Sequence, residues 1–121
     1  MKLIRLLKSL FTSTRRLAPA DCAHRARSGE AILVDVREPS EWAIGVAQSA
    51  RLLALSDLTG RRVEWNKFLA DVAGREILLY CAVGGRAGIA ARILSAEGFR
   101  AASTGGLKDW IAAGWPVSKR T

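Results

Sequence analysis

The stretch from residue 77 to residue 88 reads Ile-Leu-Leu-Tyr-Cys-Ala-Val-Gly-Gly-Arg-Ala-Gly. Its first five residues are apolar or aromatic and follow Gly74, a pattern that predicts a buried strand. Three glycines then interrupt the run, and helical spacing returns with Ile89, Ala90, Ile93 and Leu94 predicted on one buried face. We therefore expect a strand that ends at Cys81, a glycine loop, and a helix that continues to Gly98.

The rest of the chain repeats this alternation of short apolar runs and helical segments. Strands are predicted at residues 32–36 and, more weakly, at 50–53 and 100–103, with an edge strand near residue 17. Helices are predicted to begin near Pro19, at a cap formed by Ser40, and at Val63, the last stopping near Gly74. Strands separated by helices predict an α/β fold with a parallel sheet covered on both faces, whose binding sites lie beyond the carboxyl ends of the strands.

Charge is unevenly distributed along the 121 residues. Five of the 19 Lys and Arg residues, and none of the 11 Asp and Glu residues, fall in residues 1–16. The remainder is only mildly basic, which argues against a nucleic-acid-binding protein, since such proteins carry a basic stripe over the folded surface. With half of the residues hydrophobic and a quarter charged, the chain is expected to form one globular domain.

The N-terminal segment, residues 1–16, is predicted to be a basic amphipathic extension of a domain that spans residues 17–121. Its leucines recur at helical spacing, and Arg5 and Lys8 interrupt the apolar run that a secretory signal needs. Two interpretations stay open. The segment either packs on its own domain or frays, or it makes weak contact with an anionic membrane surface or a partner.

The chain holds two cysteines, Cys22 and Cys81, and one histidine, His24. These are too few for a disulfide framework or a zinc site, so we expect no bound metal. A reducing compartment is favoured, and the protein is predicted to be cytoplasmic, at most peripheral at a membrane. Cys22 is expected to be a partly buried structural thiol, and His24 an ordinary residue on a helix face.

Cys81 has a different setting, at the carboxyl end of a strand and before a glycine loop. Backbone N–H groups of residues 82–87 are expected to face inward and form a cradle that favours the thiolate, the nucleophilic form of cysteine. Arg86 adds a planar cation suited to an oxyanion. We expect the sulfur to lie at an accessible rim of the sheet. Alternatively, Cys81 is a small hydrophobic residue that only ends a buried strand.

Three ordered segments resemble the signatures of the single-domain rhodaneses, a family of sulfurtransferases. They are residues 32–42 (Ile-Leu-Val-Asp-Val-Arg-Glu-Pro-Ser-Glu-Trp), residues 81–86 (Cys-Ala-Val-Gly-Gly-Arg), and residues 105–110 with 114–117. The resemblance covers about residues 17–117. It implies a three-layer α/β/α fold with a central five-stranded parallel sheet.

The resemblance also implies a mechanism and a set of site residues. Cys81 would take sulfane sulfur from a small anionic donor such as thiosulfate, hold it as a persulfide, and pass it to cyanide, a thiol or a sulfur-acceptor protein. The substrate cradle would be formed by Ala82, Val83, Gly84, Gly85, Arg86 and Ala87. The implied reaction uses no metal and no organic cofactor.

Two other functions stay open. A non-catalytic binding module could use the same fold to recruit a protein, although an activated thiol would then have no purpose. A phosphatase or arsenate reductase of related fold is the third candidate, but four residues separate Cys81 from Arg86, and the phosphatase loop holds one more. The shorter loop favours a single sulfur atom over a tetrahedral oxyanion.

The first signature supplies three further polar residues, Asp35, Arg37 and Glu41. They are expected either to form a polar shell that positions the catalytic loop, or to pair among themselves and hold a loop and a helix together. Gly105 and Gly106 are expected to permit a close approach of their backbone to that loop. The chain departs from the family pattern after Trp42, where Val46 replaces the usual histidine.

Overall fold

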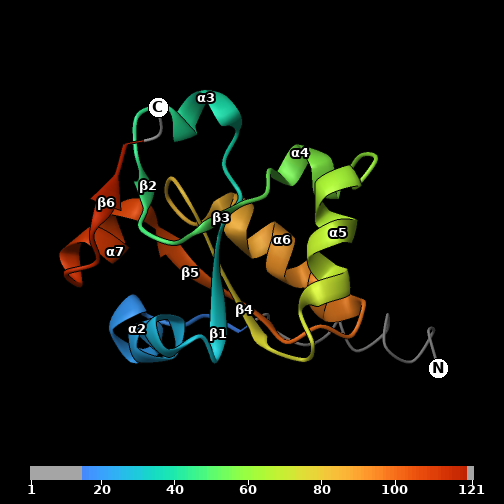
Figure 1. Cartoon of the computed structure of the whole chain (residues 1–121), viewed down its shortest axis with the longest axis horizontal. Coiled ribbons are helices and arrows are strands. Elements are labelled where there is room, and N and C mark those ends of the chain that lie inside the picture. Colours follow the sequence, from blue (N-terminus) through green and yellow to red (C-terminus); the bar gives the residue numbers. More distant parts are fainter. Residues whose placement is uncertain (1–14, 120–121) are drawn as a thin grey trace.

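The structure, a computed structural model, describes residues 15–119 and contains a parallel sheet at its centre. Its four strands are β1 (Ala31–Asp35), β3 (Arg51–Leu52), β4 (Glu76–Cys81) and β5 (Ala101–Gly106). They pair in the order β3-β1-β4-β5, and every pairing is parallel. The carboxyl ends of all four strands therefore meet at one edge of the sheet (Figure 1).

The expected fifth strand is reduced to a single bridge, so the prediction of five strands is not met in full. Arg16 pairs with Ser103 of β5 in the parallel sense. The N–H of Leu17 donates to the Ser103 carbonyl at 3.0 Å, and the N–H of Ser103 donates to the Arg15 carbonyl at 3.0 Å. Pro19 then begins a helix, which leaves too little extended chain for a longer ladder.

Helices cover both faces of the sheet, as the three-layer prediction requires. On one face lie α2 (Pro19–Ser28) and α7 (Leu107–Ala112), and on the other lie α4 (Leu55–Leu58), α5 (Val63–Asp71) and α6 (Gly85–Ala96). Successive residues of β4 alternate between the two cores: Ile77, Leu79 and Cys81 face α5 and α6, whereas Leu78 and Tyr80 face α2 and α7. This alternation fixes the side on which the Cys81 sulfur lies.

A short helix and a second small sheet lie beyond the carboxyl edge. The helix α3 (Pro39–Trp42) follows β1, and β2 (Val46–Ala47) pairs antiparallel with β6 (Val117–Ser118). The prediction that Ser40 caps α3 is wrong. Because Pro39 occupies the first helical turn, the cap is Glu38, which forms a capping box with Glu41.

The buried face of α6 also differs from the prediction. Ile89 is 48% exposed, and the buried stripe consists of Ala87, Ala90, Ala91 and Leu94. These residues follow the i, i+3, i+4, i+7 spacing of a helix face, and three of them are alanines. Small side chains let α6 lie close to β4 and β5, which leaves the larger Ile89 on the outer side.

Candidate active site

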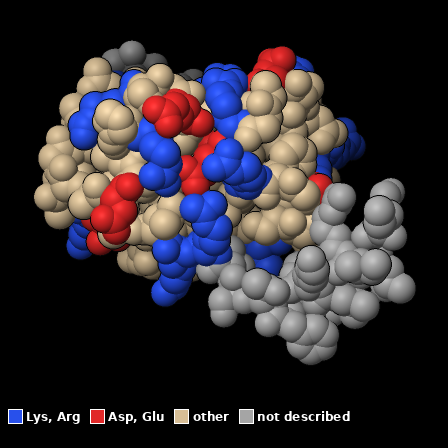
Figure 2. Space-filling view, turned by 90° about the horizontal axis from the view of Figure 1, so that it is seen from below, with Lys and Arg blue, Asp and Glu red and all other residues tan. Residues whose placement is uncertain are grey.

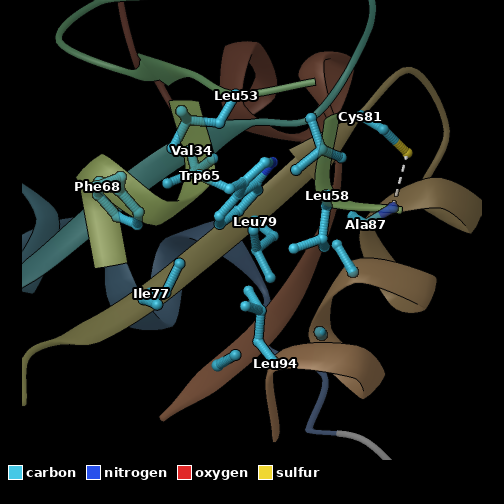
Figure 3. Close-up of a cluster of buried hydrophobic side chains, with 14 of the residues drawn as sticks. Val34, Leu53, Leu58, Trp65, Phe68, Ile77, Leu79, Cys81, Ala87 and Leu94 are labelled. Atoms are coloured by element: carbon cyan, nitrogen blue, oxygen red, sulfur yellow. Dashed lines mark hydrogen bonds between the residues drawn. The ribbon is translucent and has the colours of Figure 1, made fainter. Parts of the chain in front are cut away.

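Cys81 is the last residue of β4, and its sulfur receives backbone hydrogen bonds from the loop that follows. The Gly84 N–H donates to Sγ at 2.9 Å and the Ala87 N–H donates at 3.4 Å. Figure 3 shows the sulfur directed toward the first turn of α6, with the Ala87 bond dashed. Two of the six expected N–H groups therefore make hydrogen bonds with the sulfur in this structure.

The Cys81 side chain is covered, contrary to the expectation of an accessible sulfur. Only 1% of the residue is exposed, and it belongs to the hydrophobic cluster of β4, α5 and α6. The loop above it, in contrast, is open to solvent at Val83, which is 87% exposed. The Cys81 side chain faces α5 and α6, which places the thiol beneath the loop and away from solvent.

The loop packs tightly against the end of β5, at the two glycines expected to permit a close approach. A side chain at Gly106 would collide with the Ala82 carbonyl oxygen and would stand 3.1 Å from the Val83 Cα. Gly84 has a φ of 110° and lies against Gly105. Glycine at residues 84 and 106 is thus a steric requirement of the loop, as predicted for Gly106.

Arg86 is not free to meet an anion, because its guanidinium is held by a carboxylate. Its Nη1 and Nη2 donate to the two carboxylate oxygens of Glu41 at 2.6 and 2.9 Å. This bond from Arg86 lowers the pKa of Glu41 to about 2 and raises the pKa of Arg86 above its ordinary value. Glu41 thus joins α3 to the residue that follows the loop glycines, and its role in positioning that loop stays a prediction.

Asp35 and Arg37 form a separate buried pair. Arg37 Nη2 donates to Asp35 Oδ2 at 2.8 Å and to the Gly45 carbonyl at 2.6 Å, and Trp42 Nε1 donates to Asp35 Oδ1 at 3.2 Å. These bonds hold the segment that runs from β1 through α3 to Gly45. Asp35 and Arg37 therefore fit the alternative in which they join a loop and a helix.

Neither Cys22 nor His24 belongs to the site. Both lie on α2, where Cys22 is fully buried and donates through Sγ to the Ala18 carbonyl at 3.5 Å, while His24 is exposed. Burial raises the pKa of the Cys22 thiol to about 11. Within residues 15–119 no group of three or more His, Cys, Asp or Glu side chains is placed to hold a metal ion.

Two pockets adjoin the loop on its β5 side. One, of about 360 Å³, is lined by Val83, Gly84, Thr104, Asp109 and the segment from Arg16 to Pro19. The other, of about 380 Å³, lies along the first turns of α6 and includes Arg92. Arg16, Gly84 and Ser103 line both. Sequence reasoning missed Arg16 and Arg92, since neither lies in a motif and they are 76 residues apart.

Comparison with known proteins places the chain in a protein family and finds a yeast relative. A family model described as the rhodanese-like domain matches residues 18–113. A Saccharomyces cerevisiae thiosulfate:glutathione sulfurtransferase is 30% identical over 92 residues, which cover 69% of this chain and 66% of the yeast protein. The match thus spans just under two thirds of that relative.

Two solved structures have the same fold. A rhodanese-related protein from Thermoplasma volcanium is 28% identical with a TM-score of 0.71, over 88% of this chain and 99% of that one. A Rhodopseudomonas palustris protein of unknown function, named as a possible tyrosine phosphatase, is 24% identical with a TM-score of 0.70, over 98% of this chain and 94% of that one. At 24% identity the second likeness concerns the fold alone.

Proposed function

Because the chain belongs to the family of rhodanese-like domains, we propose that it is a sulfurtransferase whose Cys81 carries sulfane sulfur as a persulfide. The donor is a small anionic sulfur compound of the thiosulfate class, and the acceptor is cyanide or a low-molecular-weight thiol. The yeast relative, whose name gives thiosulfate and glutathione, supports this choice of donor and acceptor. A sulfur-acceptor protein is a further candidate partner.

The proposed reaction consists of two displacements at sulfur. First the Cys81 thiolate attacks the outer sulfur of thiosulfate, so that a new S–S bond forms while the bond to the sulfonate sulfur breaks and sulfite leaves with its electron pair. The acceptor then attacks the outer sulfur of the persulfide. Thiocyanate forms from cyanide, or a new persulfide forms from a thiol, and the Cys81 thiolate is restored. No external oxidant, reductant or cofactor is consumed.

The observation that carries the proposal is the convergence of backbone N–H groups on the Cys81 sulfur, at 2.9 Å from Gly84 and 3.4 Å from Ala87. Backbone donors at the start of a helix stabilise negative charge on sulfur. The site has no histidine base, since His24 is exposed on α2. The loop must therefore supply the stabilisation of the thiolate. Because Cys81 is only 1% exposed, we propose that the loop moves at its exposed tip, Val83, to admit the donor.

Incubation of the wild-type protein with thiosulfate, followed by intact-mass measurement, tests the proposal. We expect an adduct with the mass of one sulfur atom, its location at Cys81 after digestion, and its loss on addition of cyanide with release of thiocyanate. The Cys81→Ser variant should show neither step, whereas Cys22→Ala should behave like the wild type, because Cys22 is buried on α2.

The other two functions predict different results in the same samples. Release of phosphate from an aryl phosphate without formation of a persulfide would indicate that the protein is a phosphatase and not a sulfurtransferase. A Cys81 that reacts with an alkylating reagent but takes up no sulfur from thiosulfate, from mercaptopyruvate or from a small persulfide would indicate a binding module. Either result contradicts the proposal.

A further inference from the structure

Arg16 and Arg92 both line the pocket of about 380 Å³ that lies along the first turns of α6. Arg16 belongs to the short segment paired with β5, and Arg92 to the second half of α6. The loop glycines at 84 and 85 and the helix glycine at 88 line the same pocket. Both arginines are exposed, so their guanidinium groups are available to a ligand from solvent.

Neither arginine is neutralised by a carboxylate in the part of the chain that the structure describes. Among residues 15–119, Arg16 and Arg92 make no salt bridge, whereas Arg15, Arg25, Arg37, Arg62 and Arg86 all do. The fourteen residues that precede this part of the chain contain no Asp or Glu that could pair with them. Two cations that line one pocket without a counter-ion repel each other, and an anion between them removes that repulsion.

The pocket reaches the reacting sulfur through the loop backbone. Gly84 lines the pocket and its N–H also donates to Cys81 Sγ at 2.9 Å. Gly85 and Gly88 have no neighbouring atom within 4 Å of the position a side chain would take, so this side of α6 is open. An anion held here would therefore be separated from the Cys81 sulfur by the Gly84 backbone. It would also lie beside the N-terminal end of α6, where the helix dipole favours negative charge.

Arg86, by contrast, is engaged with Glu41 on the other side of the loop, at 2.6 and 2.9 Å. A bidentate pair of this kind occupies the donor fork that would otherwise bind an oxyanion. The positive charge available to a substrate thus comes from the β5 side of the loop.

We propose that Arg16 and Arg92 together bind the oxyanion group of the small sulfur compound that reacts at Cys81. This inference rests on the proposed sulfur transfer for its substrate class, but the binding itself requires no chemistry. The shared feature of the ligands is a sulfonate or carboxylate group on a sulfur compound. Thiosulfate supplies it as the donor, and glutathione supplies it as the acceptor. A volume of about 380 Å³ lies within the range of small-molecule sites.

Binding is tested first, in the full-length Cys81→Ser variant, which cannot form a persulfide. Amide resonances of Gly85 and Gly88 are followed by NMR during titration with sodium thiosulfate and, separately, with glutathione. We expect saturable shifts with at least one of the two. These shifts should be lost when Arg16→Gln and Arg92→Gln are added, and retained when the matched exposed arginine Arg61, between α4 and α5, is changed to Gln.

The two reaction steps are then measured separately in protein that retains Cys81. Persulfide formation from thiosulfate reports on the donor, and discharge of the persulfide by glutathione reports on the acceptor. The Arg16→Gln/Arg92→Gln variant should slow at least one step by about fivefold or more at low salt, the loss of a charge-assisted contact. Discharge by the uncharged thiol 2-mercaptoethanol should be unchanged, and Lys at both positions should restore part of the rate.

The step that slows identifies the ligand. A slow donor step identifies thiosulfate, and a slow acceptor step identifies glutathione. If both steps are slow, the two compounds share the site.

Several outcomes would overturn the inference. One is the absence of any shift at Gly85 and Gly88 with either ligand; another is a set of shifts that survives in the variant without Arg16 and Arg92. Rates equal to those of Arg61→Gln in both steps would do the same. If the wild type forms no persulfide but the arginine-dependent shifts remain, the proposed function fails while the anion site stands.

Discussion

Gly106 shows how a single missing side chain sets the shape of the loop that follows Cys81. It is the last residue of β5, and the loop carbonyl of Ala82 occupies the space where its side chain would be. Its N–H donates to Asp109 Oδ2 at 2.7 Å, which begins α7. The same residue therefore terminates a strand, starts a helix and gives room to the loop that holds Cys81.

We expect Gly106→Ala to lower stability by about 1–3 kcal/mol, the range for overpacking, and to reduce persulfide formation at Cys81 because the loop must shift. Urea unfolding and intact-mass measurement after thiosulfate would check the two effects. Gly88→Ala is a suitable stability control, because no neighbour lies within 4 Å of its side-chain position. On the exposed part of α6 alanine should match or exceed the stability of glycine. Equal stability of both variants would contradict the steric argument.

Two ion pairs near the site connect secondary-structure elements, and each connects different ones. Asp35 and Arg37 stand two residues apart and fasten α3 and the Gly45 carbonyl to the end of β1. Glu41 and Arg86 stand 45 residues apart and join α3 to α6. The second pair connects the first signature of the sequence to the catalytic loop, and it is the contact through which α3 can affect the thiol.

The Glu41–Arg86 pair should make stability depend on pH in the acid range. The pKa of Glu41 falls from 4.5 to about 2 on folding, so its contribution is complete above pH 4.5 and is lost as the pH falls toward 2. Since both side chains are about one third exposed, the pair should contribute only about 1 kcal/mol. Glu41→Gln should therefore be less stable than wild type at pH 7, and the difference should narrow between pH 4.5 and 2 in urea unfolding. A difference that does not change with pH would show that Glu41 acts through packing.

On the scale of the whole molecule, the amino ends of the strands meet at the edge opposite Cys81, and basic residues surround this edge. Arg75 and Arg100 directly precede β4 and β5, Arg25 and Arg27 lie in the last turn of α2, and Arg15 pairs with Glu76 at 3.0 Å. Figure 2 shows Lys and Arg side chains over this side of the molecule, with Asp and Glu side chains among them. Among residues 15–119 no helix is long and apolar enough to cross a membrane. The predicted amphipathic extension lies outside the described residues, except for Arg15 and Arg16.

We propose that residues 1–16 and this basic edge make weak contact with an anionic membrane surface. Full-length protein should co-sediment with vesicles that contain phosphatidylserine at low salt and should dissociate as salt is raised. Leu6→Glu with Leu7→Glu should weaken association by about tenfold or more, through lost apolar burial and added negative charge. Ile44→Glu, a change at a 78% exposed residue next to α3, should have little effect. Equal sedimentation of all three proteins would eliminate the contact.

The sequence by itself determined the main alternation of strands and helices and the loop at their centre. Apolar runs and glycine positions are local signals, so the strand that ends at Cys81, the loop and α6 were predicted in place. Errors remained: Pro39 moved the cap of α3 to Glu38, and the short elements α4, α7, β2 and β6 were not predicted. The reach of the N-terminal strand was overestimated because Pro19 begins α2 so soon after Arg16.

Only the tertiary structure decided which distant residues meet. Arg37 pairs with Asp35 while Glu41 pairs with Arg86, the Cys81 sulfur is buried, and Arg16 lines the same pocket as Arg92. A sequence pattern reports the preferences of a residue's near neighbours along the chain. Contacts between residues 45 or 76 positions apart depend instead on how parallel strands pair and on how closely the small residues of α6 let that helix approach the sheet.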